Sequence, residues 1–218
     1  MHTFDSKNIY QVLYDGTENV PPEKKMISRP FLNLRIGLRY LINADHSEIT
    51  SFPVTDQILT LGGLSETEAF QLAEVNTPRL LPPQAKSMYD FLWEHKIRMG
   101  ECCAVLELYL ITNIYESNGA AAVLYPGVLR ELADRISPGA EQTDLLLLPS
   151  SVHEMMAVPD RGEKDRSRSL SEMVNDINQY GVGPGDVLGR EIYRYSRKED
   201  RITDVTEAGI FHNMAAEE

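Results

Sequence analysis

Apolar and polar residues alternate in the first quarter of the chain. Arg35, Gly37 and Arg39 separate the apolar residues at 36, 38, 40 and 42, and this period of two predicts a strand with one buried face. NIYQVLY at 8–14 predicts an earlier strand, and 49–54 predicts the second arm of a hairpin after the turn residues NADHS. We favour the strand over a competing helical pattern through Phe31, Leu34, Leu38 and Leu41.

The next segment carries the signature of a helix start. Ser65 precedes a helical stripe of Ala69, Leu72 and Ala73, and Glu68 follows Ser65 at the spacing of a capping box. We expect this helix to end at Pro78, because proline lacks the amide hydrogen that a helix interior needs.

A second helix is predicted from 84 to 98, after Pro82 and Pro83, with its end marked by Gly100. Its inward residues would be Met88, Phe91 and Leu92. We expect a single α+β unit over 1–218, with a seam between two lobes near 98–103 that divides an N-lobe of 1–100 from a C-lobe of 101–218.

The second half of the chain predicts strands and helices in a regular order. Apolar runs predict strands at 104–112, 120–125, 144–148, 152–158 and 191–196, the last paired with 202–205. Helices are predicted from Pro126 to Ile136 and from Ser169 to Gly181, the second with the stripe Leu170, Met173, Val174 and Ile177. This order predicts an α+β fold, in which a mainly antiparallel sheet has its helices packed on one face.

Composition and charge limit the classes of partner. With 218 residues and 42% hydrophobic content, the chain can bury about 70% of its unfolded surface in a core of its own. The net charge of −12 argues against nucleic acid, because a backbone binder needs clustered Lys and Arg. RGEKDRSR at 161–168 is one local basic stretch, and we interpret it as a solvated loop. A protein is therefore the expected partner.

Other sequence signals indicate a cytoplasmic protein that has no membrane span and binds no cofactor. Cys102 and Cys103 are adjacent, a spacing that matches no zinc or redox motif and fits free thiols in a reducing compartment. No apolar run reaches the roughly 18 residues of a membrane span, and the N-terminus lacks the features of a signal peptide. With no phosphate loop, dinucleotide fingerprint or metal-ligand spacing, we expect no cofactor and no metal.

The candidate site is the segment LLLLPSSVHEMMAVP at 145–159, where two apolar runs flank Ser150, Ser151, His153 and Glu154. In a regular strand Ser151 and His153 would share a face at roughly 6.5–7 Å, too far for the hydrogen bond that activates a hydroxyl. Ser151 and His153 are thus candidates for catalysis only if the strand bends at Pro149. We favour a solvent-exposed or hydrogen-bonding structural role for this turn. The alternative is that Ser150, Ser151, His153 and Glu154, with Asn118, contact a ligand or partner.

Glu107 and Asn118 complete the candidate residues. Glu107 is the one charged residue in the apolar run 104–112, so its carboxylate must be paired, protonated or placed at an opening. We favour a structural ion pair or an edge position, with a catalytic acid as the alternative. Asn118 begins a turn with Gly119 and is a further candidate for contact with a ligand or partner. The strands of Asn118, Glu107 and His153 are predicted neighbours, and whether the three residues converge in a cleft would decide between a binding site and an enzyme site.

Four segments together resemble a family of unknown function that is found in bacteria, commonly in anaerobic gut species: 64–83, 110–133, 147–160 and 170–197. The similarity spans about residues 9–205. It implies the fold but no catalytic residue, and it implies a further N-terminal segment that this chain lacks.

These observations favour a non-catalytic binding or protein-interaction domain. One alternative is a small hydrolase that uses Ser150, Ser151 and His153, and another is an acidic inhibitor or nucleic-acid mimic that acts on a basic partner. Self-association is expected through an N-terminal edge strand that contains Ile9, Val12 and Leu13, because an exposed strand edge is a template for pairing.

Overall fold

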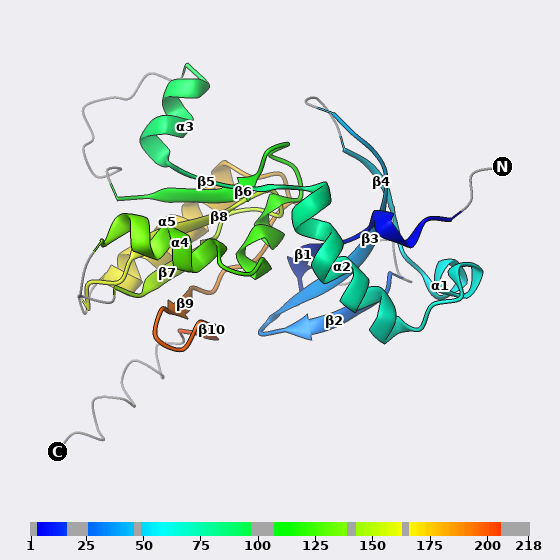
Figure 1. The fold of residues 1–218 in the computed structure, drawn as a ribbon. Coiled ribbons are helices and arrows are strands. Elements are labelled where there is room, and N and C mark those ends of the chain that lie inside the picture. Colours follow the sequence, from blue (N-terminus) through cyan, green and yellow to red (C-terminus); the bar gives the residue numbers. More distant parts are fainter. Residues whose placement is uncertain are drawn as a thin grey trace.

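The computed structural model describes residues 4–16, 26–45, 49–96, 107–138, 143–162 and 166–205. Over these ranges the chain forms helices and two antiparallel sheets, so the predicted α+β class is confirmed. Figure 1 shows the two sheets side by side, with the N-terminal sheet on the right. The predicted seam at 98–103 lies outside the described residues.

The first sheet has β3 at its centre. Its strands are β1 (Ile9–Asp15), β2 (Ser28–Phe31), β3 (Leu34–Ala44) and β4 (Ile49–Pro53), and a short 3-10 helix η1 (Ser6–Asn8) precedes β1. Strand β1 pairs with one side of β3, while β2 and β4 pair with successive parts of its other side. The predicted strand is confirmed, and the helical alternative for this segment is wrong. The predicted buried face does not extend to Ile42, which is exposed, because the register shifts between Leu41 and Asn43.

The second sheet contains six strands in the order β10-β9-β7-β8-β6-β5. These are β5 (Pro83–Ser87), β6 (Tyr109–Asn113), β7 (Leu145–Pro149), β8 (Met155–Pro159), β9 (Tyr193–Ser196) and β10 (Arg201–Asp204). The predicted final hairpin is confirmed, since β9 and β10 pair with each other. Residues 104–106 of the predicted strand 104–112 lie outside the described ranges.

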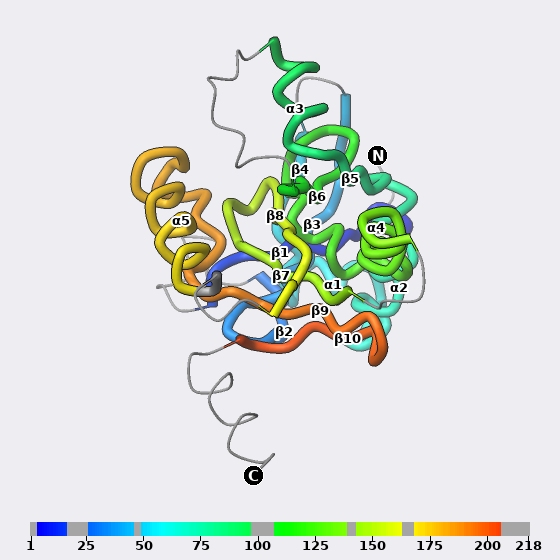
Figure 2. Tube along the Cα trace, turned by 90° about the vertical axis from the view of Figure 1, so that its left-hand side faces the viewer, coloured from blue at the N-terminus to red at the C-terminus, as the bar shows by residue number. Residues whose placement is uncertain are grey.

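Helices cover both faces of the second sheet. The helices of the described ranges are α1 (Asp56–Gly62), α2 (Glu66–Leu80), α3 (Met88–Glu94), α4 (Val128–Ile136), α5 (Arg166–Tyr180) and the 3-10 helix η3 (Gly119–Leu124), of which α3, α4, α5 and η3 pack on the second sheet. Leu145 and Leu147 share a core with α4 and η3, whereas Leu146 and Leu148 pack with α5 and α3. In Figure 2, α4 and α5 lie on opposite sides of β7 and β8. The expectation that helices pack on one face is wrong, because strand β7 is apolar on both faces.

Two elements differ in type from the prediction: a predicted strand is a 3-10 helix, and part of a predicted helix is a strand. Residues 120–125, predicted as a strand, form most of η3, where Ala120, Ala121 and Ala122 are fully buried. A short buried apolar run does not distinguish helix from strand by its pattern. Residues 83–87, predicted within a helix, pair with β6 as an edge strand, and α3 is correspondingly short. Pro82 and Pro83 favour extended backbone at this point.

Helix α2 begins as predicted and ends later than predicted. The Ser65 hydroxyl accepts from the Glu68 amide, and the Glu68 carboxylate accepts from the Ser65 amide at 2.8 Å, which confirms the capping box. Pro78 lies inside the helix, which continues to Leu80. The helix passes Pro78 because packing against β1 outweighs the loss of a single backbone hydrogen bond.

The outer edge of β1 is covered by α2. The Gln11 amide donates to Thr77 Oγ1 at 3.0 Å, and Asn76 Nδ2 donates to the Ile9 carbonyl at 3.1 Å. Thr77 and Asn76 thereby satisfy backbone groups that an edge strand leaves unpaired. Ile9, Val12 and Leu13, which we expected on an exposed edge, are all buried. Helix α2 therefore occupies the edge of β1 at Ile9 and Gln11.

One hydrophobic cluster joins the two sheets. Ile9, Leu13 and Leu38 of the first sheet belong to the same buried cluster as Leu145 and Leu147 of the second. The Tyr193 hydroxyl also donates to Asn33 Oδ1, which ties β9 to the turn between β2 and β3. The sheets thus stabilise each other through a shared core.

Candidate functional site

Residues 150–154 form the turn between β7 and β8, and β8 begins only at Met155. Ser150 and Ser151 are buried, with 2% and 3% exposure. Ser150 Oγ donates to the Glu154 carbonyl at 3.0 Å and lies 3.2 Å from Glu154 Oε1, while Ser151 Oγ accepts from the His153 amide at 3.1 Å. The two hydroxyls therefore hold the turn in shape.

His153 connects this turn to two other loops. Its Nδ1 accepts the Asn118 amide hydrogen at 3.3 Å, and its Nε2 lies 3.6 Å from Asp186 Oδ1. An Nδ1 that accepts a hydrogen bond places the ring proton on Nε2, toward the Asp186 carboxylate. The structure thus brings Asn118 and His153 together and adds Asp186, which the sequence pattern did not indicate.

The contacts of His153 hold the neighbouring loops in place, and none of them activates the hydroxyl of Ser150 or Ser151. Both ring nitrogens of His153 face groups of the protein, and neither Ser150 Oγ nor Ser151 Oγ is hydrogen-bonded to the imidazole. Nucleophilic catalysis by serine requires such a bond to a base. The hydrolase hypothesis at this turn therefore lacks its central contact.

Glu107 lies apart from the turn. Strands β6 and β8 are antiparallel with Tyr109 opposite Ala157, which places Glu107 and His153 toward opposite ends of β8. The Glu107 carboxylate pairs with the exposed Arg161 guanidinium, including a contact of 3.2 Å from Nε to Oε2. Glu107 thus has the ion pair that we favoured for it, and it does not converge with His153.

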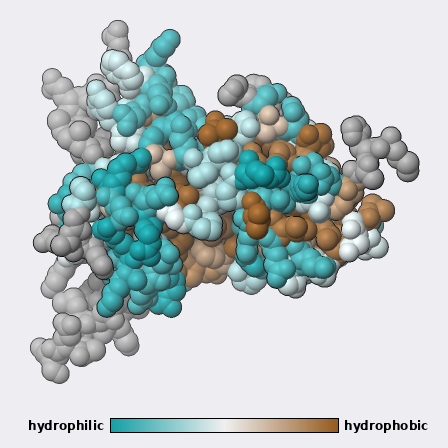
Figure 3. Space-filling model, viewed as in Figure 1, coloured by the Kyte–Doolittle hydropathy of each residue, from teal (hydrophilic) through white to brown (hydrophobic). Residues whose placement is uncertain are grey.

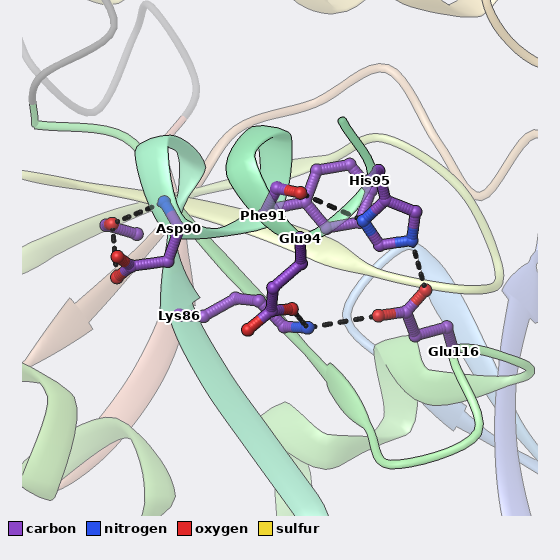
Figure 4. A network of polar contacts seen from close by, with 7 residues as sticks. Lys86, Asp90, Phe91, Glu94, His95 and Glu116 are labelled. Atoms are coloured by element: carbon purple, nitrogen blue, oxygen red, sulfur yellow. Dashed lines mark hydrogen bonds and ion pairs between the residues drawn. The ribbon is translucent and has the colours of Figure 1, made fainter. Parts of the chain in front are cut away.

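A second polar cluster surrounds Lys86 at the base of α3 (Figure 4). The Lys86 side chain is 9% exposed, and its Nζ lies 2.7 Å from Glu94 Oε2 and 3.0 Å from Glu116 Oε1. His95 Nε2 lies 3.1 Å from the other oxygen of Glu116, and His95 Nδ1 lies 2.9 Å from the Phe91 carbonyl. This Lys86 network joins β5, α3 and the loop after β6.

The electrostatics of the Lys86 network keep the lysine charged at neutral pH. Burial by itself lowers the pKa of Lys86, but hydrogen bonds and attraction from Glu94 and Glu116 outweigh it, so the pKa is raised. A raised pKa in the folded state means that this stabilisation is present at neutral pH and is lost as the pH rises through the raised value.

Glu94, His95 and Glu116 also have the spacing of a metal site, with ligand atoms that all lie within 4.8 Å of one another. The Lys86 ammonium, however, already lies against both carboxylates and would repel a second cation. We therefore interpret the cluster as a structural ion-pair network. Sequence reasoning missed it because Lys86 and Glu116 meet only through the pairing of β5 with β6.

Replacing Glu116 by glutamine should lower the free energy of unfolding by about 1 kcal/mol, because the buried Lys86 ammonium would lose a charged acceptor while partial exposure of Glu116 limits the effect. Chemical denaturation followed by the fluorescence of Trp93, the single tryptophan, would measure this. The matched control is Glu172→Gln, which removes an exposed pair with Arg168. Equal losses in the two variants would contradict the structural role of the network.

A groove of about 310 Å³ lies between the two sheets, and its lining exposes polar and apolar surface in nearly equal parts. Its floor and walls come from β2, from η3 and the start of α4, and from β9 and β10. The lining residues are Phe31, Val123, Leu124, Tyr125, Pro126, Gly127, Leu129, Tyr195, Asp200, Arg201 and Ile202. Figure 3 shows an apolar recess between the hydrophilic surfaces of α4 and of the first sheet.

One rim of the groove carries fixed polar groups. The Tyr195 hydroxyl donates to Asp200 Oδ1 at 2.6 Å, and Arg130 lies 3.3 Å from Asp200 Oδ2. The hydrogen bond from Tyr195 holds the pKa of Asp200 below its ordinary value. Asp200 has a φ of 51° and Gly127 a φ of 84°, so both backbone turns at this rim are left-handed.

A free sheet edge borders the groove. Strand β10 pairs with β9 on one side, and no strand within the described ranges pairs with its other side. The opposite edge strand, β5, is partly capped, because Arg135 donates to the Ala85 carbonyl at 2.8 Å. The groove and the unpaired edge of β10 therefore form one continuous surface.

A larger hollow of about 590 Å³ lies on the first sheet, beside α1 and the start of α2. Its lining includes Arg35, whose guanidinium bonds to Ser28 and Tyr14, and the carboxylates of Asp56 and Glu66. Because this lining combines positive and negative side chains, it favours neither an anion nor an apolar segment as a ligand. It also adjoins residues 17–25, which the structure does not describe.

Comparison with known proteins places the chain in a family. A model for a family of unknown function, DUF5688, matches residues 6–197. The chain belongs to the DUF5688 family. The resemblance to a family of unknown function is thereby confirmed. The match covers the β7–β8 turn, the Lys86 network and most of the groove, whereas β10 lies beyond the residues that match DUF5688.

No curated protein matches the chain, and no solved structure does either. Among the described residues, every helix is too short or too polar to cross a membrane.

Proposed function

We propose that this chain is a protein-interaction module that binds an extended, partly apolar polypeptide segment along β10 and in the adjoining groove. The observation that carries the proposal is the edge of β10, unpaired among the described strands, beside a groove whose lining combines apolar side chains with polar groups. Strand addition uses such an edge for backbone hydrogen bonds and neighbouring pockets for side-chain selection.

The register of β9 and β10 supports this geometry. Ile202 lies opposite Tyr195, so both side chains are on the same face of the sheet, and both line the groove. A strand added beside β10 would place every second side chain on that face. Those side chains would lie next to Leu124 and Pro126 in the groove wall.

The groove is small enough to select side chains of a peptide. Its volume of about 310 Å³ is at the lower end of the range of roughly 300–1,000 Å³ typical of small-molecule pockets. It therefore suits one or two apolar side chains better than a large cofactor. The β7–β8 turn offers the alternative hydrolase function less support, because its imidazole and hydroxyls are occupied by contacts within the protein.

The charge of the chain supports a protein ligand. A net charge of −12 repels phosphate backbones, and the acidic rim residue Asp200 adds to that repulsion at the groove. A cytoplasmic location fits the adjacent cysteines, which match no disulfide framework.

Selection of short random peptides on the immobilised protein should enrich sequences with apolar residues at alternate positions. Replacing Leu124 by lysine should weaken binding of the enriched peptides by about tenfold or more, because a charge would project into the apolar wall of the groove. Isothermal titration with one synthetic peptide from the selection would measure the affinity.

The matched control is Leu61→Lys, which adds the same charge at a residue that is 78% exposed on α1. This variant should bind the peptide as the unaltered chain does. Because Leu124 packs against the core, circular dichroism should show that both variants are folded at the temperature of the titration. If no peptide is enriched, or if both variants bind equally well, the proposed function is wrong.

A further inference from the structure

We infer that the polypeptide segment bound at β10 runs antiparallel to this strand and carries two charged residues at fixed distances from its apolar residue. A basic residue lies two positions before the apolar residue, and an acidic residue follows it directly. This inference rests on the proposed function, because it names the chemistry of the partner at the same edge. It is carried by the sequence of β10 itself, in which Arg201 and Asp204 flank Ile202 and Thr203.

The free edge presents the backbone groups of Ile202 and Asp204. The Val205 amide donates to the Ile192 carbonyl at 3.1 Å, which continues the register of β9 and β10. Because the backbone groups of a strand alternate in direction, the Thr203 amide also faces β9, whereas those of Ile202 and Asp204 face away from it. An added antiparallel strand would therefore form its hydrogen-bonded pairs opposite Ile202 and Asp204.

On the groove face, the added strand would meet the side chains of Ile202 and Asp204, which share one face of β10. Ile202 lines the groove, so the ligand residue opposite it is the apolar one. In an antiparallel pair, the ligand residue two positions earlier then lies opposite Asp204. Asp204 is exposed, and its carboxylate forms no ion pair within the described ranges. A basic ligand residue would supply that pair.

The surroundings of Asp204 are acidic. Tyr193 lies opposite Asp204 in the pairing of β9 with β10. Burial raises the pKa of the Tyr193 hydroxyl most, and the negative charges of Asp204, Glu191 and Asp15 raise this pKa further. Three carboxylates therefore act on the same hydroxyl. The negative potential at this end of β10 attracts a basic ligand residue and repels an acidic one.

The other face of β10 favours the opposite charge. The Arg201 side chain is exposed, and its guanidinium lies 2.6 Å from Glu199 Oε2. The ligand residue directly after the apolar one would lie opposite Arg201. A guanidinium has five N–H donors, so Arg201 can bind a ligand carboxylate while it keeps its contact with Glu199. An acidic ligand residue is thus favoured at this position.

A second copy of this chain is a poorer partner for the edge. Only Ile202 and Asp204 present backbone groups outward, so two antiparallel copies of β10 would have to pair these residues with each other or with themselves. Every opposite pair would then join two even-numbered or two odd-numbered residues, and Arg201 could not lie opposite Asp204. Charge complementarity therefore favours a separate polypeptide with its own order of charges.

Two peptides of identical composition, with acetylated and amidated ends, test the charge order on the full chain. When its leucine faces Ile202, the peptide TKTLET places lysine opposite Asp204 and glutamate opposite Arg201, whereas TETLKT exchanges the two charges. TKTLET should bind at least about fivefold more tightly, because two opposite-charge pairs replace two like-charge pairs. Isothermal titration would measure both affinities, and the difference should shrink at about 500 mM salt, where charges are screened.

A double variant of β10, Arg201→Asp with Asp204→Arg, should reverse this preference, so that TETLKT binds more tightly. The matched control is Arg168→Asp with Glu172→Arg, which exchanges an exposed pair of charges on α5 and should keep the preference for TKTLET. Circular dichroism checks that both variants are folded. An unchanged preference in the folded β10 variant would overturn the inference.

The peptides enriched by selection separate this inference from the proposed function. If enriched peptides lose affinity for Leu124→Lys while TKTLET and TETLKT bind equally, the groove is a peptide site and the inferred charge order is wrong. Tighter binding of TELTKT than of TKTLET would overturn the antiparallel direction, because the charges of TELTKT fit a parallel strand. If no peptide is enriched and none of the three binds, both the proposed function and the inference are wrong.

Discussion

Replacing Leu132 by alanine should lower the free energy of unfolding by about 2–5 kcal/mol, the range for a large side chain deleted from a packed core. Leu132 is 2% exposed, lies in the middle of α4 and belongs to the cluster that joins the two sheets. The loss would therefore weaken the packing of α4 and the contact between sheets together. Urea denaturation monitored by circular dichroism would measure it.

Two further variants show whether burial decides the size of this effect. Ile177→Ala on α5 should cost less than Leu132→Ala, because Ile177 is only partly buried against the second cluster. Leu61→Ala on α1 should change the stability by no more than about 0.5 kcal/mol, because Leu61 is 78% exposed. A loss for Leu132→Ala as small as that for Leu61→Ala would contradict the core described for α4.

Local sequence signals predicted the elements whose stability is decided locally. The alternation at 36–42 predicted β3, and Ser65 with Glu68 predicted the first turn of α2. The stripe from Leu170 to Ile177 predicted α5. The Gly181 amide donates a hydrogen bond to the Ile177 carbonyl at 2.8 Å, which closes that helix. In each case a period or a cap is visible within a few residues.

Elements that depend on distant partners were not predictable in the same way. Gly119–Leu124 and a buried strand have the same apolar pattern, and only the packing between two sheets selects the 3-10 helix. Pro83–Ser87 becomes a strand through pairing with β6, which begins more than twenty residues later. Helices cover both faces of the second sheet, which follows from the burial of every residue of β7 and β8.

In the candidate site, too, some features could be predicted from neighbouring residues, whereas others depend on distant segments of the chain. Ser150, Ser151 and His153 were predicted as polar residues between two apolar runs, with His153 at the start of the second strand, and the structure places all three in the turn before β8. The contact of His153 with Asn118 followed from the expected strand neighbours, whereas Asp186 reaches the imidazole from a loop far along the chain. The groove was not predicted, because its walls come from segments near residues 31, 125 and 200 that no single pattern connects.

Replacing Gly119 by alanine should destabilise the protein by about 2–3 kcal/mol, near the upper part of the range for an overfilled site. A Cβ at this position would lie 2.5 Å from the His153 carbonyl oxygen and 2.7 Å from the Asn113 amide nitrogen, and it would overlap Thr112 Oγ1. Two of these three neighbours are backbone atoms, which cannot move without shifting a strand or the β7–β8 turn.

The same substitution tests how the β7–β8 turn is held. Thr112 Oγ1 donates to the His153 carbonyl at 2.8 Å, and a methyl group between them would break this bond and displace the imidazole from the Asn118 amide. Thermal denaturation would report the loss, and the His153 ring resonances in NMR spectra would report the displacement. The control is Gly185→Ala, where an added Cβ has no neighbour within 4 Å, so its stability should change by no more than about 0.5 kcal/mol. If Gly119→Ala is as stable as Gly185→Ala, the close approach of η3 to this turn is not a feature of the folded protein.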